Sequence, residues 1–362
     1  MSSVTSITNT DKINYVNIGL MLLALGVAFY IPFELFLFSY AVLGPGHYLT
    51  EISWLQKRGF FSKGKYDYVF LTIAALVLFL IAYVLTPQQL IKPEAHRGVT
   101  TAIIYVAFAG ALGMVLVKSA FYRFIIFIVI ALTALISKEM FVLFSVFLPT
   151  LLHVYLFTGL FMLFGALKGK SRSGYLAMAV FVICPLLIIF VNPEALPLTE
   201  YASNAYKKFQ LLNIESLKLL SDNFSLMFSD TYEAVSQFGG TPEALFASRS
   251  NAIYTSDTGI AIMRFIAFAY TYHYLNWFSK TSVIKWHEIS KLRMGIIIGL
   301  WALAVLLYWW DYNIGFNVLF LLSFMHVFLE FPLNHVTFIG VFKEIFGTKQ
   351  AVQEKTQAKA RR

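Results

Sequence analysis

The sequence predicts an all-α protein, a polytopic transmembrane helix bundle of about ten spans with no soluble catalytic domain. Of its 362 residues, 59% are hydrophobic and only 13% are charged, whereas about 25% of a typical soluble domain is charged. Several apolar runs are as long as the ~20 residues that a helix needs to cross a bilayer. The basic residues gather at the ends of these runs, as the positive-inside rule expects.

The apolar runs divide the chain into ten predicted spans. Pro32 separates the first two, because proline is tolerated at the start of a helix, where its missing N–H costs little. Gly44-Pro45-Gly46 interrupts the second run and predicts a broken helix beside a cavity. The ten runs are 14–31, 33–55, 68–86, 99–117, 122–137, 141–167, 174–192, 259–279, 294–310 and 315–342.

The loops between these spans alternate in charge. Those predicted to lie on one side hold 13 lysines and arginines, and the alternate short loops hold three. The richer side is expected to be cytoplasmic. The pattern therefore predicts a multi-pass protein of the cell (inner) membrane, with N- and C-termini both in the cytoplasm and membrane lipids as its surroundings.

Four regions follow from this topology. Residues 1–192 are expected to hold spans one to seven, and residues 259–345 spans eight to ten. Residues 193–258 are predicted to form an extracytoplasmic helical cap, with an amphipathic helix at about 203–236 that acts as a structural cap or as a lid over a substrate entrance. Residues 346–362 form a basic, polar cytoplasmic tail that is expected to be disordered.

Several function classes find no support in the sequence. The net charge of +9 reflects the basic flanks of the spans, so no nucleic acid partner is expected. The single cysteine, Cys184, excludes an internal disulfide and a cysteine-based metal site. Phosphate-binding loops, the G-x-S-x-G elbow, the H-E-x-x-H zinc motif and the multi-histidine boxes of membrane desaturases are all absent from the sequence.

Ionisable residues inside the predicted spans are the candidate functional residues, because they are costly in a bilayer. Five of the seven histidines lie in or near span interiors, on four spans that run in the same direction. At about 1.5 Å of rise per helical residue, they lie roughly 10–25 Å above the predicted cytoplasmic boundary. They are His47, His153, His273, His326 and His335. Their depths overlap, so a convergent cluster is geometrically possible.

Two of these histidines begin the same H-x-x-x-E pattern, His47 with Glu51 and His326 with Glu330. A spacing of four places both side chains on one helix face. The carboxylate is then a metal ligand, or it orients a ligating imidazole. Asn276 follows His273 by three residues and is able to orient that imidazole in the same way.

These observations predict a membrane-embedded metal-dependent enzyme, an oxidoreductase acting on a lipid-soluble substrate such as a lipid, an isoprenoid or a quinone. The five histidines are the predicted metal ligands, and Glu51 and Glu330 the predicted catalytic residues. Imidazole and carboxylate ligands favour iron, with copper or zinc as alternatives, and haem with paired axial histidines is a variant. Three other hypotheses remain open: a proton-coupled transporter using the same residues, polar residues that only bond neighbouring helices, and a structural subunit.

Overall fold

The computed structural model describes residues 8–85, 88, 93–134, 152–208, 254 and 257–347. Its regular secondary structure is helical throughout these residues. The helices are α1 (Asn9–Tyr30), α2 (Pro32–Phe38), η1 (Ser39–Leu43), α3 (Gly44–Lys57), η2 (Gly59–Phe61), α4 (Asp67–Leu80), η3 (Ile81–Leu85), α5 (Pro93–Leu116), α6 (Ala120–Ala134), α8 (Thr158–Gly169), α9 (Arg172–Phe190), α10 (Glu200–Lys208), α14 (Asp257–Ser279), α15 (Thr281–Ile284), α16 (Lys291–Trp310), α17 (Tyr312–Phe342) and η5 (Lys343–Gly347).

Seven of the described helices are long and apolar enough to cross a membrane, which confirms the predicted all-helical membrane bundle. They are Asn9–Tyr30, Asp67–Leu85, Gly98–Leu116, Leu152–Gly169, Arg172–Phe190, Lys291–Trp310 and Tyr312–Gly347. Helix α14, the segment from α2 to α3 and the shorter apolar helix α6 are not among them, although all three were predicted spans. Helix α14 and the segment from α2 to α3 each carry histidine, tyrosine and threonine side chains that are buried inside the bundle. The count of ten spans and the side on which each loop lies remain predictions.

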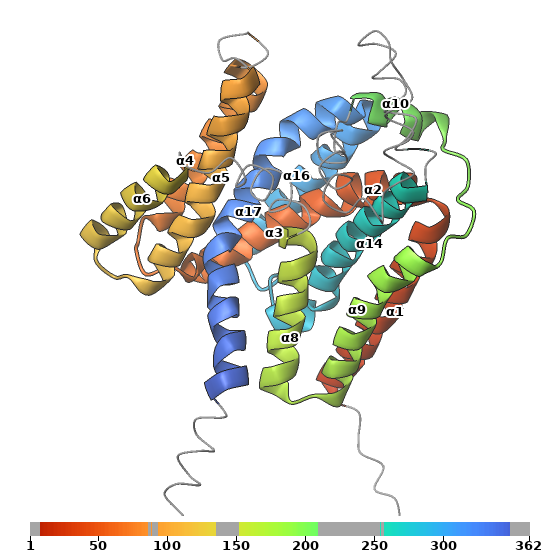
Figure 1. The fold of residues 1–362 in the computed structure, drawn as a ribbon, viewed down its shortest axis with the longest axis horizontal. Helices are drawn as coiled ribbons and strands as arrows, with labels where there is room; N and C mark the ends of the chain where they lie inside the picture. Colours follow the sequence, from red (N-terminus) through yellow and green to blue (C-terminus); the bar gives the residue numbers. More distant parts are fainter. Residues whose placement is uncertain are drawn as a thin grey trace, which may run out of the picture.

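The helices form two groups that meet at α17 and α3 (Figure 1). Helices α4 and α5 pack against α17, and α6 packs on α5. On the other side of the bundle, α1 packs against both α9 and α14, and α14 also contacts α2. Each group has its own cluster of buried apolar side chains. Helix α1 begins and α17 ends at the same edge of the bundle (Figure 1).

The outer faces of the helices are apolar, as contact with lipid requires. Only 17% of the most apolar stretch of α16 is buried in the protein, and Leu303 and Leu306 are among its exposed side chains. Trp309 and Trp310, at the end of the same helix, are 81% and 79% exposed. Exposed tryptophans at a helix end are typical of the belt where a membrane meets water.

The predicted break at Gly44-Pro45-Gly46 is a π-helical turn within one continuous run of helix. The π-turn η1 ends immediately before Gly44, and α3 follows without a gap. Such a turn leaves backbone groups without their usual partners, and here the indole Nε1 of Trp301 donates to the carbonyl oxygen of Val42 at 2.6 Å. A Cβ atom on Gly46 would overlap the ring of Trp301, so the close packing of α16 on α3 requires glycine at this position.

A second π-helical stretch, residues 152–157, leads into α8 and contains His153. Pro149, which precedes it in the sequence, lies outside the described residues. Pro332 is buried inside α17 without ending the helix. Two of the four helices that carry clustered histidines thus have π-turns beside them, and such turns are frequent at functional sites.

Of the predicted cap, the structure describes mainly the first part. Helix α10 contacts α2 and α17. The hydroxyl of Tyr206 donates to the backbone carbonyl of Phe33 at 3.0 Å. Most of the predicted amphipathic helix at 203–236 lies outside the described residues, as does nearly all of the tail at 346–362.

The contact between Gly46 and Trp301 gives a direct test of this packing. We expect Gly46→Ala to lower the free energy of unfolding by about 1–3 kcal/mol, the usual cost of overfilling a packed site. The matched control is Gly295→Ala on α16, where a Cβ atom meets nothing within 4 Å and alanine favours the helix by about 1 kcal/mol. Thermal unfolding in detergent should show opposite effects, and equal effects would contradict the packing described.

Candidate functional site

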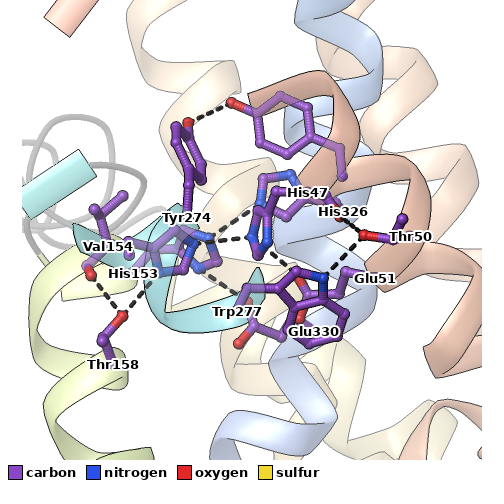
Figure 2. A network of polar contacts seen from close by, with 12 residues as sticks. His47, Thr50, Glu51, His153, Val154, Thr158, Tyr274, Trp277, His326 and Glu330 are labelled. Carbon is purple, nitrogen blue, oxygen red and sulfur yellow. Dashed lines mark hydrogen bonds and ion pairs between the residues drawn. The ribbon is translucent and has the colours of Figure 1, made fainter. Parts of the chain in front are cut away.

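Four histidines from four separate helices meet in the interior of the bundle. His47 comes from the first turn of α3, His273 from the last third of α14 and His326 from the middle of α17. The fourth, His153, comes from the π-helical stretch before α8. Their exposed fractions are between 1% and 7%. Figure 2 shows His47, His153 and His326 pointing toward one another.

The imidazoles approach through their Nε2 atoms. The Nε2 atoms of His47 and His273 are 3.0 Å apart, and those of His153 and His326 are 3.2 Å apart. The two pairs are also close to each other, because the ring centroids of His47 and His326 are 5.4 Å apart. One ligand atom each from His47, His273 and His326 lies within 4.8 Å of the others, so these three residues could hold a metal ion.

These separations match those of nitrogens that share one metal. Metal–nitrogen bonds to histidine are about 2.0–2.1 Å, so two nitrogens on one ion lie about 3.0 Å apart at a right angle and about 3.4 Å apart at a tetrahedral angle. Both observed Nε2 separations fall within this span. A hydrogen bond between two imidazoles has a similar length, so the protonation of the rings must decide between the two arrangements.

For His273, Thr158 determines which ring nitrogen carries the proton. The hydroxyl of Thr158 donates its one hydrogen to the carbonyl oxygen of Val154, at 2.7 Å. Its oxygen also lies 2.7 Å from Nδ1 of His273, so it accepts the Nδ1 proton. The Nε2 atom of neutral His273 therefore presents a lone pair toward His47, as metal ligation requires.

The two predicted carboxylates lie beside the histidines. An oxygen of Glu51 is 3.0 Å from Nε2 of His47, on the side of the imidazole that faces His273. An oxygen of Glu330 is 3.3 Å from Nδ1 of His153. Glu330 therefore contacts a histidine on another helix, although the H-x-x-x-E pattern had associated it with His326. Both carboxylates are at most 3% exposed.

Several polar atoms here lack hydrogen bonds of normal geometry. They are the Nδ1 atoms of three histidines and one oxygen of each glutamate: His47, His153, His326, Glu51 and Glu330. Native proteins leave few buried polar groups unsatisfied, and two buried carboxylates without a cation nearby are costly. The two glutamate oxygens face imidazole nitrogens of His47 and His153, so a cation bound at the Nε2 atoms would also offset the charge of these carboxylates.

A layer of aromatic and hydroxyl groups holds the histidines in place. The ring of Tyr48 stacks on His326, with centroids 4.1 Å apart, and its hydroxyl bonds that of Tyr274 at 2.7 Å. The indole Nε1 of Trp277 donates to Thr50 at 2.9 Å. Thr50 in turn donates to the carbonyl oxygen of Gly46 at 2.7 Å. These bonds join α3 to α14 on either side of His47 (Figure 2).

The structure does not bring the fifth predicted ligand, His335, into this cluster. Its Nε2 atom donates to the backbone carbonyl of Phe108 on α5 at 2.8 Å, and its ring packs against that of Phe108. Asn276 does not orient His273 either, because its side-chain oxygen faces the hydroxyl of Tyr272 at 3.5 Å. Thr158 takes that role, and nothing in the sequence distinguished it from other threonines in apolar spans.

A cavity of about 410 Å³ leads to the site from one end of the bundle. At its inner end it is lined by His47, Glu51, His273 and Glu330. Its walls are mostly apolar and come from α1, α3, α8, α9, α14 and α17. Small-molecule sites typically occupy about 300–1,000 Å³, so the cavity is large enough to bring a small apolar molecule to the histidines.

Comparison of the sequence with protein families and with curated proteins, and of the fold with solved structures, found no match. The functional argument therefore depends on the geometry and chemistry of the site itself.

Proposed function

We propose that the chain is an integral membrane metal-dependent enzyme, an oxidoreductase that acts on a lipid-soluble substrate. The observation that carries the proposal is the convergence of four Nε2 atoms, paired at 3.0 and 3.2 Å, with one of them fixed as a lone-pair donor by Thr158. Glu51 and Glu330 would complete the ligand set or orient the imidazoles.

Iron is the favoured metal, with copper or zinc as alternatives. The donors are imidazole nitrogen and carboxylate oxygen, and this set suits all three ions. A bound iron or copper ion would supply the electron transfer or oxygen chemistry. The Nε2 separations of 3.0 and 3.2 Å favour ligation of one ion by neighbouring histidines over the haem variant. Two histidine nitrogens on opposite faces of a haem would be about 4 Å apart at the same metal–nitrogen bond length.

The lining of the cavity supports an enzyme that acts on a lipid-soluble substrate more than a transporter of a polar solute. The cavity reaches the histidines from one side. On the other side, buried tyrosines of α3, η1 and α14 pack around them in the described structure: Tyr40, Tyr48, Tyr270 and Tyr274. The mostly apolar walls also suit a lipid-soluble substrate better than a polar solute.

The first test is the metal content of the purified full-length protein. We expect a stoichiometric transition metal, most of which is lost in His47→Ala and in His273→Ala, because each change removes an Nε2 atom from the cluster. Elemental analysis measures both. Native protein that binds no metal would contradict the proposal, and so would variants that keep the native metal content.

His335→Ala is the matched control for these variants. His335 is also a buried histidine on α17, but it bonds the backbone of α5 and lies outside the cluster. We expect this variant to retain the native metal content and to lose about 1–3 kcal/mol of stability, because the carbonyl of Phe108 is left without its donor. Loss of metal in His335→Ala as in His47→Ala would indicate a general effect of unfolding.

Thr158 tests whether the orientation of His273 matters. We expect Thr158→Val to weaken metal binding about 10–100-fold, the usual effect of removing an outer partner of a ligating histidine. Thr158→Ser retains the hydroxyl and should bind the metal nearly as the native protein does. Competition with a chelator measures the affinities, and equal affinities in the serine and valine variants would show that the hydroxyl has no role.

A further inference from the structure

The outer part of the cavity contains one cationic side chain. Among the described residues that line the cavity, Lys280 is the only lysine or arginine. It follows the end of α14, seven residues after His273, a separation of about 10 Å along a helix axis. The cavity thus has the metal-ligand cluster at one end and a positive charge nearer the other.

Lys280 is half-buried and its ammonium has no hydrogen bond or ion pair within the described structure. Other basic groups nearby have partners. Lys57, for example, donates to the carbonyl of Glu288 at 3.0 Å, and Lys285 pairs with the carboxylate of Glu288 at 3.2 Å. Burial lowers the pKa of Lys280 to about 8, so the ammonium remains mostly charged at neutral pH. A half-buried charge without a counterion fits a site that receives an anion.

Polar side chains lie close to Lys280 in sequence and in space. Asn17 and Asn276 line the cavity, and Asn17 accepts a hydrogen bond from Ser279, the residue before Lys280. Most other lining residues are apolar and include Phe161, Met162, Trp277, Leu333 and Val336. A molecule that fills the cavity therefore needs a polar anionic end and an apolar body.

We propose that the cavity binds a single-chain lipid carboxylate, with its head at Lys280 and its chain extending to the histidine cluster. The inference rests on the proposed function in one respect. A metal at the histidine cluster would face the hydrocarbon chain of the lipid and not its carboxylate head. The binding of the head at Lys280 depends on the cavity and its charge alone.

A carboxylate matches this site better than a phosphate does. One lysine supplies one positive charge, and the nearby amides are neutral. A phosphate monoester carries a charge of about −1.5 to −2 at neutral pH and would enter the cavity with excess negative charge. The carboxylates of Glu51 and Glu330 at the inner end would disfavour such excess further.

The test is a comparison of three ligands that share one chain. Full-length protein in non-ionic detergent is titrated with oleate, with oleyl alcohol and with the oleoyl lysophosphatidate, and binding is measured by calorimetry. We expect native protein to bind oleate most tightly. Lys280→Gln should weaken oleate binding about tenfold or more, as loss of a hydrogen bond between charged groups does, and should leave oleyl alcohol binding nearly unchanged.

Lys285→Gln is the matched control, because its side chain is 56% exposed and does not line the cavity. It should bind oleate as the native protein does. Equal binding of oleate and oleyl alcohol by native protein, tighter binding of the lysophosphatidate, or equal weakening of all three ligands in Lys280→Gln would overturn the inference.

The metal content of the same preparations separates this inference from the proposed function. Oleate binding that depends on Lys280 in protein without any metal would support the lipid site and contradict the metalloenzyme. Stoichiometric metal in a protein that does not distinguish oleate from oleyl alcohol would overturn the lipid site alone.

Discussion

Polar groups inside a membrane protein must find their partners within the protein, because the bilayer core supplies none. At the centre of this bundle that requirement is concentrated on four imidazoles and two carboxylates, which come together from α3, α14, α17 and the π-helical stretch before α8. Much of the surrounding structure holds these groups at fixed separations. The π-turn before His47, the glycine that admits Trp301 and the threonine that fixes His273 all act on this one cluster.

The cluster explains why α3 and α14 are less apolar than the helices around them. Their histidine, tyrosine and threonine side chains face the interior, where they bond one another across helices. The more apolar α16 exposes most of its surface and contributes Trp301, which braces α3 from outside. Hydropathy along the chain therefore sets α3 and α14 apart, whereas α17 and the helix over residues 152–169 carry site residues and are still apolar enough to span a membrane.

The sequence was sufficient for the membrane bundle, and four of the five histidines predicted as ligands lie together in the structure. In-span histidines are costly and co-directional spans place them at similar depths, so His47, His153, His273 and His326 could be predicted together. His335 could not be excluded, because it faces the backbone of Phe108 and only the packing of α17 on α5 shows this. Likewise, Glu330 lies on the same helix as His326 yet contacts His153. The packing of the helices, and not the spacing in the sequence, sets the distance between Glu330 and His153.

Other features depended on contacts between distant residues. Gly44-Pro45-Gly46 indicates a distorted helix, but this sequence pattern is the same for a π-turn and for a broken helix. Thr158 resembles any threonine in an apolar span until Val154 and His273 are placed on either side of its hydroxyl. The cavity and its unpaired Lys280 arise from six helices, α1, α3, α8, α9, α14 and α17, and from the segments between them, so no local pattern could reveal them.

The central proposal is that Nε2 atoms of the histidine cluster ligate a metal ion, and X-ray absorption at the metal edge of the purified protein tests it most directly. The account predicts a shell of at least three nitrogen neighbours at about 2.1 Å, with the multiple-scattering pattern of imidazole rings. A shell of oxygen neighbours without imidazole scattering, or the absence of any metal edge, would contradict it.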